Sequence, residues 1–193
     1  MGTAAGKAFH ETAWSSRLSF ELAGIDQAVQ ALVSGLSEEK LNWQPAPGAW
    51  SIGQCLEHLS ITNEKYVSAI GPALEAQPDA PVEEIRPGWL SAWFLKHYVE
   101  PSPGGKKAPA PGKIRPAVQV SSSVIPRFLA SNRACRELIV RARSKDVNRI
   151  RFWNPVVTGV WFTVGVGFQI VASHEQRHVL QCERVKDSPS FPG

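Results

Sequence analysis

Two histidines near the end of the chain lie four residues apart. They are His174 and His178, in the segment His-Glu-Gln-Arg-His. On a helix both fall on the apolar stripe that also carries Val171 and Cys182, so both imidazoles should point into the protein. A buried imidazole needs a hydrogen-bond partner or a cation, and this spacing lets both rings reach one ion. The pair predicts a site for zinc or nickel, metals that imidazole binds well. Two core histidines satisfied by hydrogen bonds are the alternative.

The same five residues match H-E-x-x-H, the signature of zinc metalloproteases. The rest of the sequence argues against a protease. Only 15 residues follow His178, they contain no histidine, and the H-x-x-G-x-x-H extension is absent. Too little chain remains to build a second lobe of a protease cleft. The spacing is therefore interpreted as a metal site of another kind.

Two helical histidines need a third ligand from elsewhere. The candidates are His58, His10, His97 and Cys182. His58 lies on the flank of an apolar helix stripe, where a side chain can reach a neighbouring helix. Cys182 is one turn beyond His178 on the same face, although a small buried hydrophobic residue is the simpler interpretation. For His10 and His97, positions at the surface or in an aromatic cluster are expected.

Glu175 stands between the two histidines and is predicted to point partly inward. A carboxylate there could act as a general base, or it could orient an imidazole by a hydrogen bond. A carboxylate on the helix surface is an equally good interpretation. Glu175 is therefore the candidate catalytic residue.

Four helices are expected to position these side chains. The first covers about residues 10–34. The second begins at Ser51, where Gln54 completes a capping box, and Gly71-Pro72 is expected to bend or end it near Ile70. The third starts near Ser123. The fourth covers about 159–185, although residues 158–167 would also suit a strand. With no convincing alternation of strands, the pattern predicts an all-α four-helix bundle.

A long irregular crossover, residues 71–118, is expected between the second and third helices. Within it, residues 88–99 could form a short helix. Its aromatic side chains could cover a pocket or pack under the long loop, and packing under the loop is the preferred interpretation. Residues 100–116 contain five Pro, three Gly and four Lys/Arg. This composition predicts a basic, extended surface loop.

Two motifs resemble the DinB/YfiT-like superfamily. Residues 50–59, Trp-Ser-Ile-Gly-Gln-Cys-Leu-Glu-His-Leu, resemble the superfamily's second-helix motif, and residues 174–181 resemble its fourth-helix motif. The resemblance covers most of the chain and implies a single four-helix-bundle domain over residues 1–193. It also implies one divalent ion, zinc or nickel, held by His58, His174 and His178. Three protein ligands leave open positions for water or substrate.

The function implied by this resemblance is a metal-dependent enzyme that transfers or hydrolyses a group on a small molecule. A low-molecular-weight thiol is a possible co-substrate, and a homodimer is expected. The alternative is a metal-containing binding protein without catalysis, whose basic surface meets an anionic partner.

Composition and charge limit the remaining possibilities. The 193 residues suit one globular domain, and neither a signal peptide nor a membrane span is recognisable, so a cytoplasmic protein with no membrane partner is expected. The three cysteines suggest reduced thiols. Residues 1–95 carry 5 Lys/Arg and 11 Asp/Glu, a net charge of −6, whereas residues 96–193 carry 16 and 6, a net charge of +10. Without a nucleic-acid-binding motif, this asymmetry is interpreted as complementary surfaces and a basic loop.

Overall fold

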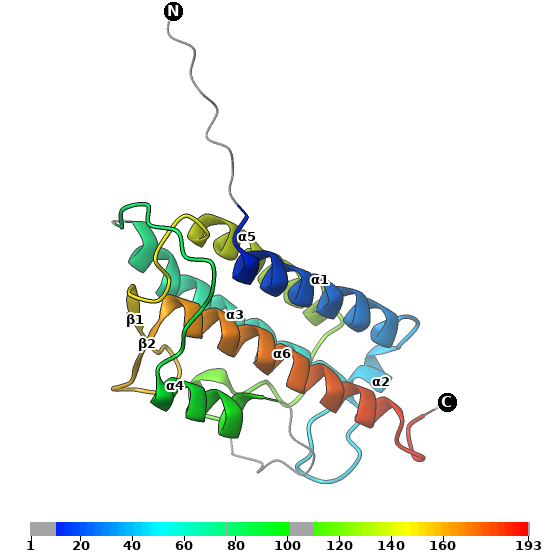
Figure 1. The fold of residues 1–193 in the computed structure, drawn as a ribbon. Helices are drawn as coiled ribbons and strands as arrows, with labels where there is room; N and C mark the ends of the chain where they lie inside the picture. The colour runs from blue at the N-terminus through cyan, green and yellow to red at the C-terminus, as the bar shows by residue number, and fades with distance from the viewer. Residues whose placement is uncertain (1–10, 76, 101–109, 193) are drawn as a thin grey trace, which may run out of the picture.

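Four long helices form the body of the protein, as the sequence predicts. The structure is a computed structural model that describes residues 11–75, 77–100 and 110–192. The long helices are α1 (Ala13–Val33), α3 (Ile52–Glu75), α5 (Val124–Ala142) and α6 (Val164–Lys186). Helices α1 and α3 each pack against both α5 and α6, which closes the bundle around one apolar core (Figure 1). A short helix, α2 (Glu38–Asn42), lies between α1 and α3.

The helical stripes read from the sequence are the buried faces. In α1 the stripe from Trp14 to Leu32 is buried, and the Trp14 ring stacks on Phe168 of α6 at 5.8 Å between centroids. The predicted start of this helix, His10, lies outside the described residues. The observed helix follows Thr12, a residue with the extended backbone of an N-cap.

Helix α3 begins where the capping box predicts and ends later than expected. The Gln54 backbone amide donates to Ser51 Oγ, and the Ser51 amide donates to Gln54 Oε1, both at 3.1 Å. Of the two outcomes expected at Gly71-Pro72, an end near Ile70 does not occur, because the helix continues through Pro72 to Glu75. Ile70 and Leu74 are both buried on the same face. Their packing holds the last turn in place although Pro72 cannot donate a hydrogen bond within it.

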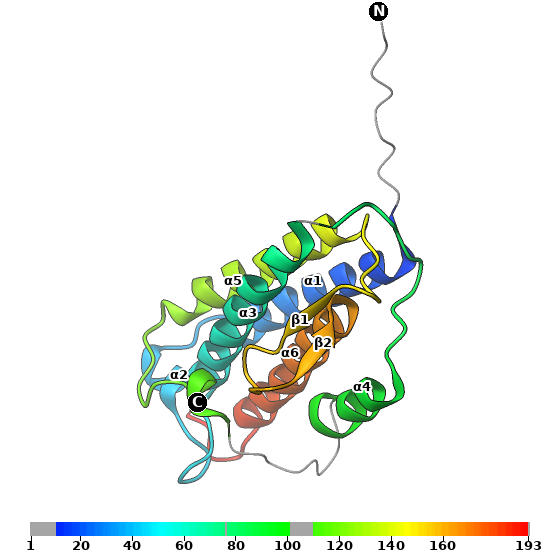
Figure 2. The ribbon, with the colours of Figure 1, turned by 90° about the vertical axis from the view of Figure 1, so that its left-hand side faces the viewer.

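The crossover between α3 and α5 is largely irregular, as predicted. Its regular elements are α4 (Trp89–Phe94), the π-helix η1 (Leu95–Val99) and the 3₁₀ helix η2 (Gly112–Ile114). The first two fall in the predicted short helix over 88–99. Buried Leu95 and Val99 anchor η1, which packs against α6. Figure 2 shows α6 between α3 on one side and α4 on the other.

A small hairpin replaces the predicted start of the fourth helix. Strands β1 (Arg151–Trp153) and β2 (Trp161–Thr163) pair antiparallel, with Phe152 opposite Phe162 (Figure 2). Helix α6 therefore begins at Val164 and not near residue 159, and β2 confirms the strand that the sequence allowed within residues 158–167. Both phenylalanines are buried, so hairpin formation covers apolar surface that a helix would leave open.

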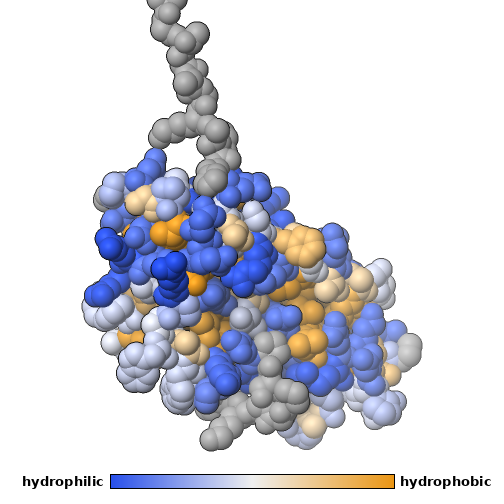
Figure 3. Space-filling view, in the orientation of Figure 1, coloured by the Kyte–Doolittle hydropathy of each residue, from blue (hydrophilic) through white to orange (hydrophobic). Residues whose placement is uncertain are grey.

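The outer surface is polar with scattered apolar patches. Hydrophobic side chains alternate with hydrophilic ones on the face shown in Figure 3. Within the described ranges, no helix combines the length and apolar character that crossing a membrane requires.

Candidate metal centre

Helices α3 and α6 bring three histidines together. His58 comes from α3, and His174 and His178 come from α6. One ring nitrogen from each lies within 4.8 Å of the other two, and the Nε2 atoms of His58 and His174 are 3.2 Å apart. The structure thus places the predicted third ligand beside the helical pair.

Hydrogen bonds fix the orientation of two of the rings. His58 Nδ1 lies 2.6 Å from the carbonyl oxygen of Ile114 in η2. Because a carbonyl can only accept, Nδ1 carries the proton and Nε2 keeps its lone pair. His178 Nδ1 likewise donates to Gln181 Oε1 at 3.1 Å. His58 thereby turns an unprotonated Nε2 toward His174, and Gln181 favours the same tautomer for His178, the arrangement that metal-binding histidines use.

The surroundings keep the three imidazoles neutral. Burial lowers the pKa of His58 and of His174, and the His178 and His58 rings lower the His174 pKa further. Burial, followed by His58 and Arg177, lowers the pKa of His178 to about 3. A neutral imidazole is the form that binds metal, so the cluster is ready for a cation at neutral pH.

The geometry of the cluster fits a divalent metal. Tetrahedral zinc with Zn–N bonds of about 2.0–2.1 Å separates its ligand nitrogens by about 3.3 Å. The observed separation between His58 and His174 is 3.2 Å. The donor set of three neutral nitrogens suits zinc or nickel and leaves further positions for small ligands.

An aromatic ring covers one side of the cluster. The Trp50 ring lies 4.7 Å from the His58 ring and stacks on His178 at 5.8 Å between centroids. His58 is buried, whereas His174 and His178 are only partly buried. The α3 side of the cluster is therefore more deeply buried than its α6 side.

The other predicted third ligands lie elsewhere or outside the described residues. The Cys182 thiol is hydrogen-bonded with Cys55, and this contact together with burial raises the pKa of Cys55. His97 stacks on Trp93 at 5.1 Å, in the aromatic cluster that the sequence allowed. His10 lies outside the described residues. His58 is the one candidate that joins the helical pair in the part of the chain that the structure describes.

Glu175 belongs to a buried polar network. Its side chain is fully buried, Oε1 accepts a 2.7 Å hydrogen bond from Asn63 Nδ2, and Oε2 has no partner in the described part of the chain. Burial raises the pKa of Glu175 to about 8. Neither oxygen bonds an imidazole, so the carboxyl group is held by α3 and is largely protonated at neutral pH. Its catalytic role stays a prediction.

Sequence reasoning missed two contributors to the cluster. The Ile114 carbonyl is a backbone group in the crossover, and no pattern of side chains predicts its contact with His58. The Trp50 ring precedes the capping box and could have been suspected from that position. Gln54, which completes the capping box, also donates to the carbonyl oxygens of Ala117 and Val118 at 3.1 and 3.2 Å, which ties the crossover to α3.

The aromatic residues of the crossover do not all pack inward. Trp93 and Tyr98 are 47% and 54% exposed, and their rings contact each other at 5.6 Å. Phe94 joins them to the hairpin through Phe162 at 5.2 Å. The expectation of ordinary packing is thus wrong for Trp93 and Tyr98, because the crossover is anchored by Leu95 and Val99 instead.

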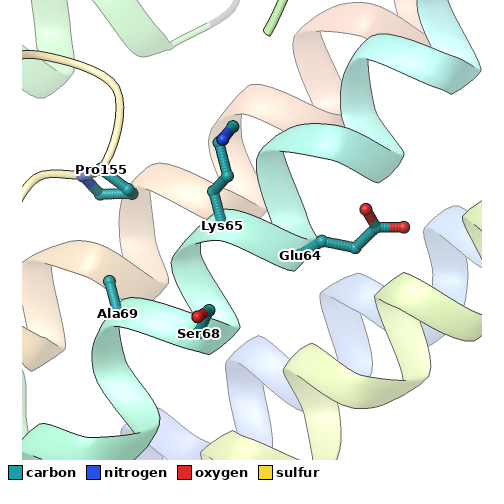
Figure 4. Close-up of a pocket in the computed structure, with 5 residues that line it drawn as sticks. All are labelled: Glu64, Lys65, Ser68, Ala69 and Pro155. Carbon is teal, nitrogen blue, oxygen red and sulfur yellow. The ribbon is translucent and has the colours of Figure 1, made fainter. Parts of the chain in front are cut away.

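A surface depression on α3 is separate from the histidine cluster. It has a volume of about 350 Å³ and is lined by Glu64, Lys65, Ser68, Ala69 and Pro155 (Figure 4). None of these residues is a member of the cluster. Of the basic loop over 100–116, residues 101–109, with Lys106 and Lys107, lie outside the described residues, whereas Lys113 is exposed and donates to Thr158.

Comparison with known proteins identifies the family. The sequence profile of the DinB superfamily matches residues 21–182, a span that includes all three histidines of the cluster. The chain belongs to the DinB superfamily. This DinB-superfamily chain is also similar to the uncharacterized protein YuaE of Bacillus subtilis (strain 168). The two are 29% identical over 160 residues, which cover 80% of this chain and 88% of YuaE.

A solved structure has the same fold. YfiT from Bacillus subtilis is described as a probable metal-dependent hydrolase with an unusual four-helix bundle topology. It matches with a TM-score of 0.58 over 100% of this chain and 97% of its own, at 13% sequence identity. At this identity the likeness concerns the fold alone, and it confirms the predicted four-helix bundle.

Proposed function

We propose that this DinB-superfamily protein is a metal-dependent enzyme that transfers or hydrolyses a group on a small molecule. His58, His174 and His178 would hold one divalent ion, zinc or nickel. The observation that carries the proposal is the convergence of the three rings, two of which have Nδ1 hydrogen-bonded to an acceptor outside the cluster. The description of YfiT as a probable metal-dependent hydrolase agrees with it.

A bound divalent ion would supply Lewis acidity and lower the pKa of a coordinated water or thiol toward neutrality. The chain's own groups prepare for this chemistry. The Ile114 carbonyl and Gln181 orient two ligands, and the Trp50 ring shields one side of the cluster from water. Glu175, protonated near neutral pH, suits a proton donor or a positioning group better than a general base.

Metal analysis tests the site. The purified protein should retain about one zinc or nickel ion per chain, and His58→Ala or His174→Ala should abolish retention. His97→Ala is the matched control, because this exposed histidine stacks on Trp93 outside the cluster. A wild-type protein that retains no added metal, or a His58→Ala variant that retains it fully, would overturn the site.

Turnover assays separate the two reaction types. Activity that requires a physiological low-molecular-weight thiol supports group transfer, whereas hydrolysis without any thiol supports a hydrolase. Stoichiometric metal without turnover of either kind would favour a binding protein without catalysis.

A further inference from the structure

A short segment of the crossover, residues 114–120, is held against α3 by side chains. We call this segment the strap. After Ile114 it forms no helix or strand, so its backbone must find hydrogen-bond partners outside itself. Ile114, Pro116 and Val120 are buried, whereas the residues between them are exposed. One side of the strap therefore faces the protein, and the contacts on that side determine where the strap lies.

Two residues on one face of α3 bind the middle of the strap. Gln54 and Glu57 precede His58 by four residues and by one, which places all three close together on the helix. Gln54 Nε2 donates to the carbonyl oxygens of Ala117 and Val118, at 3.1 and 3.2 Å. Glu57 Oε2 accepts a 2.6 Å hydrogen bond from the Ala117 amide. Ala117 is thus bound through both its amide and its carbonyl group.

The far end of the strap is fixed separately by α2. The Val120 amide donates to Asn42 Oδ1 at 2.9 Å, and the Val120 carbonyl oxygen accepts from Asn42 Nδ2 at 2.7 Å. Gln54 and Glu57 bind the strap between this anchor and Ile114. They are therefore the contacts that restrain the part of the strap next to His58.

The near end of the strap supplies the acceptor for His58. The Ile114 carbonyl oxygen lies 2.6 Å from His58 Nδ1 and belongs to a residue three positions before Ala117. Between the two, Pro116 has a fixed φ and restricts Arg115 to extended backbone, which Arg115 adopts with φ −74° and ψ 131°. Because this connection is short and stiff, a shift of Ala117 should also move the Ile114 carbonyl.

The other nitrogen of the His58 ring faces a second partner. His58 Nε2 lies 3.2 Å from His174 Nε2. While the Ile114 carbonyl is in place, a neutral His58 keeps its proton on Nδ1, and Nε2 has a free lone pair. Without that acceptor, the tautomer with the proton on Nε2 becomes the favoured one, since it can donate to His174. A protonated nitrogen cannot bind a metal ion.

We propose that Gln54 and Glu57 are positioning residues, which hold the strap where it keeps the proton of His58 on Nδ1 and so leave Nε2 available to a metal ion. Neither residue would touch the metal. Release of the strap would lower the metal affinity without the loss of any ligand. The effect on metal affinity rests on the proposed function, whereas the tautomer of His58 is a property of the metal-free protein.

Two substitutions remove the strap contacts one at a time. Glu57→Ala removes the acceptor for the Ala117 amide, and the fold should persist because Ala117 is exposed and water can replace the lost partner. Gln54→Glu removes the donors to Ala117 and Val118. It keeps an oxygen that can accept from the Ser51 amide, so the capping box is preserved.

A conservative variant and a matched control separate the strap contact from a general effect of charge. Glu57→Gln retains an acceptor for the strap but loses the charge that faces Arg127 at 3.8 Å, and it should behave as the wild type. Glu64→Ala removes another carboxylate of α3, one that binds Arg127 at 2.8 Å and not the strap, and it should also behave as the wild type.

¹⁵N NMR of the metal-free protein tests the tautomer, because the chemical shifts of the ring nitrogens distinguish protonated from unprotonated sites. The wild type, Glu57→Gln and Glu64→Ala should carry the His58 proton on Nδ1. Glu57→Ala and Gln54→Glu should show a substantial population with the proton on Nε2. An unchanged Nδ1 tautomer in both variants would overturn the inference. Should Gln54→Glu fail to fold, Glu57→Ala decides alone.

Zinc affinity, measured by competition with a chromophoric chelator, tests the consequence for the metal site. Glu57→Ala and Gln54→Glu should each bind zinc about tenfold more weakly than the wild type, as expected when a group that orients a metal-binding histidine is lost. Zinc bound at wild-type affinity by both variants contradicts this inference and leaves the metal site intact. A wild-type protein that binds no zinc overturns the proposed function, while the ring spectrum still decides the role of the strap.

Discussion

At the scale of single residues, the proposed metal site includes groups that would not be metal ligands themselves. Ile114 and Gln181 accept the Nδ1 protons of His58 and His178, which leaves the Nε2 lone pair of each ring unprotonated. Such partners typically change metal affinity 10–100-fold when they are removed. We therefore expect the metal affinity to depend both on the three histidines and on the hydrogen-bond partners that orient them.

Gln181→Leu should weaken zinc binding by about 10–100-fold without unfolding the protein, because His178 loses the acceptor that fixes its tautomer. Competition with a chromophoric chelator measures the affinity. Gln176→Leu provides the control, since Gln176 is exposed on the same helix. Equal affinities for the two variants would show that Gln181 does not orient the ring.

Glu175 should make stability depend on pH. Burial raises its pKa to about 8 from an ordinary value of 4.5, so the folded protein keeps a proton that the unfolded chain releases. The stability that this group contributes is complete below about pH 4.5 and is lost as the pH rises through 8, at a rate of up to about 1.4 kcal/mol per pH unit. Glu175→Gln removes this ionisation.

Urea unfolding of metal-free protein at several pH values tests the prediction. The free energy of unfolding of Glu175→Gln minus that of the wild type should increase between pH 5 and pH 8. Glu183→Gln, an exposed carboxylate on the same helix, should give a constant difference. A constant difference for Glu175→Gln as well would refute the raised pKa.

At the scale of elements, close packing of the hairpin on α6 determines where the helix begins. A Cβ atom added at Gly167 would lie 2.7 Å from the Phe152 ring and 3.0 Å from Cδ1 of Ile70. The absent side chain therefore lets β1 and α3 approach α6 together. This approach supports the helix that carries two of the three histidines.

Gly167→Ala should lower the free energy of unfolding by about 1–3 kcal/mol, because the ring of Phe152 must move to avoid the new methyl group. Denaturant unfolding measures the change. In Gly24→Ala the added atom meets nothing within 4 Å, so that helical substitution should be neutral or stabilise by up to about 1 kcal/mol. Equal effects of the two substitutions would contradict the close packing at Gly167.

At the scale of the whole molecule, the cluster joins two helices that are far apart in sequence. His58 and His174 are 116 residues apart, and a metal between them would link α3 to α6 across the bundle. The crossover completes the site, because Ile114 in η2 holds His58. A ligand that binds only the folded arrangement must stabilise the whole fold.

Zinc in thousandfold excess over its dissociation constant should raise the free energy of unfolding by about 4 kcal/mol, since the unfolded chain does not hold the three rings together. Thermal unfolding with zinc and with a chelator measures the shift. His58→Ala should lose most of the shift, whereas His97→Ala should retain it. An unchanged shift in His58→Ala would place the stabilising zinc elsewhere.

The sequence by itself determined the four helical stripes, the capping box at Ser51 and Gln54 and the pairing of His174 with His178. These features are local, because helical periodicity and capping act over a few residues. The same local reasoning left two boundaries open, because Gly71-Pro72 could bend or end α3 and residues 158–167 suited either a helix or a strand.

Local reasoning left the third residue open and the family resemblance named His58, whereas only the tertiary structure decided which nitrogen of the His58 ring is free and where Glu175 points. Each of these depends on how distant segments pack: Ile114 of the crossover on α3, and Asn63 of α3 beside α6. Packing decides the length of α3 and the hairpin before α6 in the same way, since Leu74 beyond Pro72 and Phe152 and Phe162 of the hairpin are all buried. Contacts between segments far apart in sequence set these features, and no periodicity within one segment encodes them.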